Sequence, residues 1–146
     1  MVLCSLVAVL IPILVPANTT AIEERSEVKC DVQLASTSLK AGGTGELVFT
    51  FSPDEGIHIN TDPAMEIEFD KSSPVRFTGI TSLPKSPKTG YLDPSKPVRC
   101  SFVVSKSVKK GKHTLKGTVQ YYFCSDTEGW CNRSSQPIEL TFTVVP

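Results

Sequence analysis

Two cysteines near the C-terminal end of the chain are the residues best suited to chemistry. Cys124 and Cys131 are separated by six residues, Ser-Asp-Thr-Glu-Gly-Trp. Thr114 to Phe123 before them and Ile138 to Val145 after them have the composition of β-strands. Neighbouring strand ends can bring two Cα atoms to the separation of about 4.4–6.8 Å that a disulfide needs, and Gly129 can take a positive φ in the turn. The sequence therefore predicts a bridge across a polar loop.

Such a bridge is either a structural staple or a redox switch. As a staple, the small ring would stabilise a hairpin by about 2.5 kcal/mol in the chain-entropy model. As a switch, it would exchange with the thiols of a partner protein. The polar loop favours the switch because a partner could reach the sulfur atoms, and Trp130 would offer that partner an exposed aromatic docking contact.

The charges around the two thiols predict different roles for them. Asp126 and Glu128 lie on the side of Cys124 and disfavour its thiolate, whereas Arg133 lies two residues beyond Cys131 and favours its thiolate. Because the thiolate is the nucleophile, Cys131 is the expected attacking thiol. Cys124 is then the expected resolving thiol.

The elements that must position this pair are short strands separated by turns. Val98 to Val104 and Val28 to Leu34 alternate apolar and polar residues, which is typical of half-buried strands. Further strands are expected at Glu46 to Phe51, Ile57 to Asn60, Ala64 to Phe69 and Val75 to Ile80, with a hairpin turn at Lys109 to Lys112. Seven or eight strands without a helical period predict an all-β, immunoglobulin-like antiparallel β-sandwich, with a small barrel as the alternative.

One connection is unusually long for a compact domain. Leu83 to Pro97 contains four prolines and carries Tyr91 within it. Loops of this length are commonly lids or binding loops. It is therefore either a crossover between sheets, with Tyr91 resting on the rim, or a cap over a site at that end of the molecule.

The N-terminal residues have the composition of an export signal. Residues 1–22 carry no charged side chain, and Val2 to Val15 is an apolar run broken by Pro12. The run is too short for a comfortable membrane span and resembles the apolar part of a secretory signal. We expect a signal peptide at 1–17, a polar tail at 18–26, one domain at 27–146, and a periplasmic or otherwise exported location.

The composition argues against several other classes of function. Fifteen basic residues balance fifteen acidic ones, and no basic motif appears, so we expect no nucleic-acid partner. The two histidines, His58 and His113, have no metal-ligand spacing, and we expect neither a metal nor another cofactor. His58 is interpreted as a partly buried strand residue and His113 as a solvated one.

Two further cysteines, Cys30 and Cys100, fall among the core-facing residues of two expected strands. They are either buried thiols that act as small apolar groups or the two halves of a cross-sheet disulfide. The sequence does not decide between these.

The cysteine segment resembles the N-terminal periplasmic domain of DsbD, the thiol:disulfide interchange protein. The resemblance rests on Lys112 to Asp126 with Cys131 and a closing strand, on Gly56 to Asn60, and on the turn Leu39 to Gly43. It covers roughly Val28 to Val145. The chain departs from the family in the longer spacing of the two cysteines, in the absence of a proline soon after the second, and in the additional Cys30 and Cys100.

The resemblance implies an immunoglobulin-like sandwich whose Cys124–Cys131 pair cycles between dithiol and disulfide, with Tyr91 as a cap residue that shields it. It also implies a thioredoxin-like or membrane electron donor acting in trans, and periplasmic thiol-disulfide proteins as acceptors. Two other classes of function remain: a non-catalytic immunoglobulin-like binding module with a structural hairpin disulfide, and a β-sandwich that carries a ligand in a large apolar cavity.

Overall fold

The computed structural model describes residues 27–146, and these form an all-β domain. The expected signal peptide at 1–17 and the expected polar tail at 18–26 lie outside the described residues. Within 27–146, no helix is long and apolar enough to cross a membrane. The strands in chain order are β1 (Val28–Leu34), β2 (Ser38–Lys40), β3 (Thr44–Pro53), β4 (Ile57–Ile59), β5 (Glu66–Phe69), β6 (Val75–Ser82), β7 (Val98–Val104), β8 (Gly111–Ser125) and β9 (Trp130–Val145).

The strands are divided between two sheets. One has the order β1-β3-β7-β6, and the other has the order β2-β9-β8-β4, with β5 also paired to β8. All pairs are antiparallel except the short β2–β9 pair, which is parallel. The all-β, largely antiparallel prediction is therefore confirmed. The largest fully buried side chains come from both sheets and include Tyr121, Phe49, Phe102, Phe142, Leu47 and Leu115.

Alternation of apolar residues explains why these segments form strands. In β7, Val98, Cys100, Phe102 and Val104 are all fully buried, while the residues between them are partly exposed. Successive strand side chains point to opposite faces, so this pattern gives one face to the core and the other to solvent. The bounds of β1 and β7 are those predicted from the sequence.

Two connections differ from the expectation. β7 and β8 belong to different sheets, so the segment around Lys109 to Lys112 crosses between the sheets and is not a hairpin turn. By contrast, β6 and β7 are antiparallel neighbours in one sheet, so the 83–97 loop leaves and re-enters the same sheet. Of the two interpretations of this loop, the crossover between sheets is therefore wrong.

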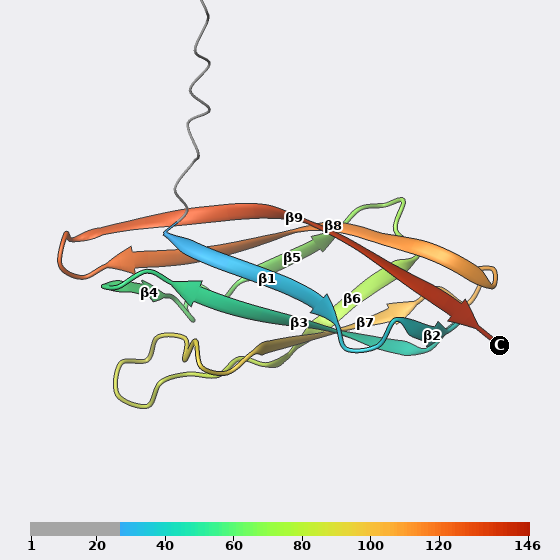
Figure 1. Cartoon of the computed structure of the whole chain (residues 1–146), viewed down its shortest axis with the longest axis horizontal. Coiled ribbons are helices and arrows are strands. Elements are labelled where there is room, and N and C mark those ends of the chain that lie inside the picture. Colours follow the sequence, from blue (N-terminus) through green and yellow to red (C-terminus); the bar gives the residue numbers. More distant parts are fainter. Residues whose placement is uncertain (1–26) are drawn as a thin grey trace, which may run out of the picture.

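The two longest strands, β8 and β9, pair from Gly111↔Val144 to Ser125↔Trp130 and form a hairpin along the length of the domain. Figure 1 shows the tip of this hairpin, strand β4 and the loop between β6 and β7 at the same end of the molecule. That end carries the candidate functional site.

Candidate functional site

Cys124 and Cys131 form a disulfide, as the sequence predicts, but they lie inside the strands and not in a loop. They are direct register partners in the β8–β9 ladder, and their Cα atoms are 4.0 Å apart, closer than the expected range. The turn is limited to residues 126–129. Gly129 there has a φ of 72° and donates its N–H to the Ser125 carbonyl at 2.9 Å. Because the strands extend further than predicted, the two cysteines are held side by side by the sheet itself.

The disulfide lies on the outer face of its sheet, away from the other sheet. Tyr121 and Phe123 of β8 belong to the core, so Cys124, one position further along the strand, points to the opposite face. On that face the two sulfur-bearing residues differ in exposure. Cys124 is only 7% exposed, whereas Cys131 is exposed.

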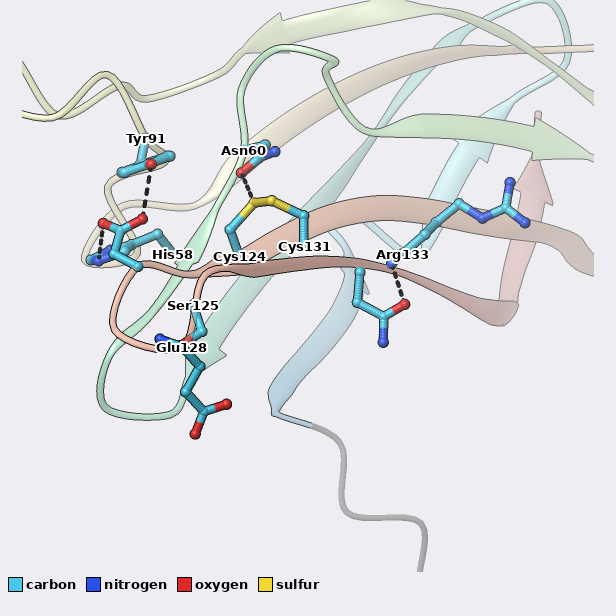
Figure 2. The surroundings of a disulfide bond; sticks show 10 residues. His58, Asn60, Tyr91, Cys124, Ser125, Glu128, Cys131 and Arg133 are labelled. Carbon is cyan, nitrogen blue, oxygen red and sulfur yellow. Dashed lines mark hydrogen bonds and ion pairs between the residues drawn. A yellow bond between two sulfur atoms is a disulfide. The ribbon is translucent and has the colours of Figure 1, made fainter.

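Strand β4 and the residue after it cover the Cys124 side. His58 is the register partner of Cys124 on the edge away from β9. The Asn60 side chain lies against the disulfide, with its Oδ1 at 3.5 Å from the Cys124 Sγ (Figure 2). When the bond is reduced, this oxygen can accept a hydrogen bond from the S–H group of Cys124.

The expected cap residue, Tyr91, lies beside the hairpin tip. Its hydroxyl donates to Asp126 Oδ1 at 3.3 Å, and its ring stacks on His58 with centroids 4.9 Å apart and planes 6° apart. The other Asp126 oxygen lies 3.3 Å from His58 Nε2 (Figure 2). The charge of Asp126, followed by burial and the hydrogen bond, raises the pKa of the Tyr91 phenol.

Backbone hydrogen bonds attach the 83–97 loop to the edge of β4. The Leu92 N–H donates to the Ile59 carbonyl at 2.9 Å, and the Thr61 hydroxyl donates to the Gly90 carbonyl at 2.7 Å. Leu92 itself is buried in the core. With Leu92 anchored inward, its neighbour Tyr91 is positioned over the outer face.

His58 has a position in the site that sequence reasoning missed. It was interpreted as a partly buried strand residue, which it is, since it lies in β4 and its side chain is 37% exposed. The signal that could have placed it was the alternation of Ile57, His58 and Ile59, because two buried isoleucines put the imidazole on the outer face.

Trp130 is partly buried, in contrast to the exposed ring expected from the sequence. Its ring packs edge-to-face on Phe123 with centroids 6.0 Å apart, and its Nε1 donates to Glu128. Strand pairing opposite Ser125 places it on the face away from the disulfide. Trp130 also lines an open depression beside the acidic residues Glu27, Asp54, Glu55 and Glu128.

The charges do not surround the thiols as the sequence suggested. Asp126 is engaged with His58 and Tyr91, and Glu128 is engaged with Trp130. Figure 2 shows the Arg133 side chain directed away from the disulfide, while its backbone N–H donates to Asn132 Oδ1 at 2.8 Å. The difference between the two sulfur atoms therefore comes from exposure and from Asn60, and not from Arg133.

Cys30 and Cys100 are free and buried. They lie on β1 and β7 of one sheet with β3 between them, and they pair there with Phe51 and Leu47, so they do not oppose each other. Burial raises the pKa of each thiol to about 12, with smaller contributions from Asp31 to Cys30 and from Glu46 to Cys100. Cys30 and Cys100 are therefore buried thiols that act as small apolar groups, and they do not form a cross-sheet disulfide.

The structure offers little room for a ligand between the sheets. The apolar space bounded by Phe51, Ile59, Met65 and Leu92 has a volume of about 0 Å³ for a water-sized sphere, whereas ligand pockets measure roughly 300–1,000 Å³. In comparisons with known proteins, no family model matches the chain and no curated protein matches it.

Proposed function

We propose that this chain is an exported thiol–disulfide exchange domain of the DsbD N-terminal type, with an immunoglobulin-like sandwich as its scaffold. The observation that carries the proposal is the asymmetry of the disulfide on the outer face of the sheet: Cys131 is exposed and Cys124 is 7% exposed. An exchange protein needs one sulfur that a partner can reach and a second that is kept for resolution.

The hairpin itself argues against a purely structural bridge. β8 and β9 pair continuously from Gly111↔Val144 to Ser125↔Trp130, so the ladder holds the two strands together without the disulfide. The bond closes a sequence separation of only 7 residues, and its loss costs about 2.5 kcal/mol in the chain-entropy model. The domain can therefore break and remake the bond while its fold persists.

The reaction proceeds in two balanced steps from the dithiol form. The Cys131 thiolate attacks one sulfur of the partner's disulfide; that bond breaks, a mixed disulfide forms, and the partner's first thiolate leaves and takes up a proton. The Cys124 thiol then loses its proton and attacks Cys131 Sγ, which expels the partner's second thiolate. The domain loses two electrons and two protons, and the partner gains both.

The chemistry of this step indicates the partners. Reduction of the disulfide requires a dithiol donor, which we propose is a thioredoxin-like domain or a membrane electron-transfer protein. The acceptors are periplasmic thiol-disulfide proteins. In this proposal the 83–97 loop is the cap, with Tyr91 on the Cys124 side, and the partly exposed Trp130 at the hairpin tip is a docking contact.

Trapping of a mixed disulfide tests the proposal. Cys124→Ala removes the resolving thiol, so the reduced variant should form a stable adduct through Cys131 with an oxidised thioredoxin-like protein, detected by non-reducing electrophoresis and peptide mass. Cys131→Ala should form at least about tenfold less adduct, because the remaining sulfur is sheltered. Cys100→Ala is the matched control and should exchange like the wild type.

Two outcomes would contradict the exchange function. If Cys124→Ala forms no adduct while remaining folded, the domain is better explained as a binding module with a structural disulfide. If both variants form equal amounts of adduct, the assignment of attacking and resolving thiols is wrong.

A further inference from the structure

Three separate segments of the chain meet in one polar cluster beside the disulfide. Asp126 comes from the hairpin tip, His58 from edge strand β4, and Tyr91 from the 83–97 loop. We name these three residues the Asp126 cluster. The Asp126 carboxylate contacts both other side chains. Its Oδ1 accepts a hydrogen bond from the Tyr91 hydroxyl, and its Oδ2 lies 3.3 Å from His58 Nε2.

The imidazole occupies the central position of this cluster. It stacks flat on the Tyr91 ring, contacts Asp126 through Nε2, and belongs to the residue directly opposite Cys124 in the β4–β8 ladder. The imidazole therefore lies between Tyr91 of the loop on one side and strand β8, which carries Cys124, on the other.

Both contacts of the imidazole strengthen when it is protonated. The contact with Asp126 becomes an ion pair with a charge-assisted hydrogen bond. The contact with Tyr91 gains a cation–π component, because a cation is attracted to the face of an aromatic ring. Histidine is the side chain whose charge ordinarily changes between pH 5 and 8.

Other titratable groups also face His58. Cys124 lies opposite it in β8, Asp126 and Tyr91 contact it, and Lys88 and Asp93 of the loop line the same depression. Asp93 is paired with Lys96 at 3.1 Å, and side-chain hydrogen bonds from Ser95 and then from Lys96 lower the pKa of its carboxyl. Lysine and aspartate side chains ordinarily titrate outside pH 5–8, whereas an imidazole ordinarily titrates within it.

We propose that His58 is a positioning residue that holds Tyr91 and the 83–97 loop against the edge of β4 beside Cys124. The loop is held tightly when the imidazole is charged and more loosely when it is neutral. This inference rests on the proposed function for its consequence: closure keeps partners away from Cys124 and directs them to Cys131. A rise in pH from 5.5 to 8 then loosens the loop and exposes the resolving sulfur.

Hydrogen exchange of the Leu92 amide measures closure directly, because that N–H is bonded to the Ile59 carbonyl. The oxidised protein is compared at pH 5.5 and 8, with each rate referred to an unstructured peptide at the same pH. Wild-type protection should fall about two- to fivefold, the range expected when a partly exposed ion pair is lost. His58→Phe keeps the stacking ring but not the charge, and its Leu92 protection should be low and independent of pH.

The other histidine supplies a matched control. His113 lies beside Phe142 at the opposite end of β8, and His113→Phe should leave the pH dependence of Leu92 unchanged. The Val104 amide, bonded to the Gly43 carbonyl, reports whether each variant keeps its fold. Leu92 protection that is flat with pH in the wild type, or equally pH-dependent in His58→Phe, would overturn the proposal.

A second measurement reads the effect on the thiols. At pH 6, in the reduced protein, the ratio of iodoacetamide labelling at Cys131 to that at Cys124 should be two- to fivefold lower in His58→Phe than in the wild type. An unchanged ratio would refute the shielding role of His58. Because the exchange of Leu92 is measured without any redox partner, loss of mixed-disulfide formation alone would refute the proposed function and leave the positioning role of His58 intact.

Discussion

The domain contains two pairs of cysteines in strands, and they are in opposite situations. Cys124 and Cys131 are bonded on the outer face of one sheet, with one sulfur open to solvent. Cys30 and Cys100 are free, point into the core from the other sheet, and are separated by β3. All four belong to regular strands, so strand membership does not decide their chemistry.

The difference shows that the face of the sheet decides what a cysteine can do. On the core side, burial withholds water from the thiolate and raises the pKa of both Cys30 and Cys100 to about 12. On the outer side, a register pairing brings two sulfur atoms together where a partner can approach. A shift of one residue along a strand would move its cysteine to the other face of the sheet.

The largest expected effect is on alkylation. In the reduced, folded protein at pH 8, Cys131 should react with iodoacetamide at least about a thousandfold faster than Cys30 or Cys100. A thiol of pKa about 12 is ionised to roughly one part in ten thousand at that pH, and the core also blocks the reagent. Peptide mass after timed quenching measures each rate.

Unfolding in urea is the control for this comparison, since the three thiols should then react at similar rates. Comparable labelling of Cys30 and Cys131 in the folded protein would remove the distinction between the two pairs.

The next effect is on stability. Reduction of the Cys124–Cys131 bond should lower the free energy of unfolding by about 2.5 kcal/mol and leave a cooperative transition, because the β8–β9 ladder remains. Urea titrations with and without reductant measure the difference. The double variant Cys124→Ser/Cys131→Ser should match the reduced wild type. A reduced domain that has no folded baseline would mean that the bond is required for the fold.

The smallest effect, taken per thiol and per pH unit, is a dependence of the free energy of unfolding on alkaline pH. The unfolded chain releases thiol protons near pH 8.5, whereas folded Cys30 and Cys100 keep theirs to a pKa of about 12. The contribution of these raised pKa values to the free energy of unfolding is complete below pH 8.5. It falls as the pH rises, by at most about 1.4 kcal/mol per pH unit for each thiol. Urea titrations from pH 8.5 to 10.5 should show a shallower decline in Cys30→Ala/Cys100→Ala. An identical slope would contradict the raised pKa values.

Local patterns predicted the strands but not their partners. β7 and β1 match the prediction residue for residue because each alternates cleanly between core and solvent. The first half of β9 was missed because Asn132 to Gln136 are polar and mostly exposed, so no buried face is visible in that stretch. For this reason the disulfide was expected to bridge a loop, whereas it joins paired residues of the β8–β9 ladder.

The site was predicted only where it is local in sequence. The Cys124–Cys131 bond closes a short separation, and nearness along the chain was enough to identify it. The contacts of Asp126 with Tyr91 and His58 span 35 residues or more and depend on how β4 registers against β8 and on where the 83–97 loop returns. Neither pairing leaves a periodic signal in the sequence.

The most direct test of the account is the reduction potential of the Cys124–Cys131 bond. The domain is equilibrated in thiol buffers of graded potential, alkylated, and quantified by peptide mass, with Cys100→Ala as the control. The account predicts a midpoint between about −180 and −270 mV, the range of proteins that exchange disulfides. A midpoint below about −300 mV, accompanied by unfolding on reduction, would identify a structural bond and contradict the account.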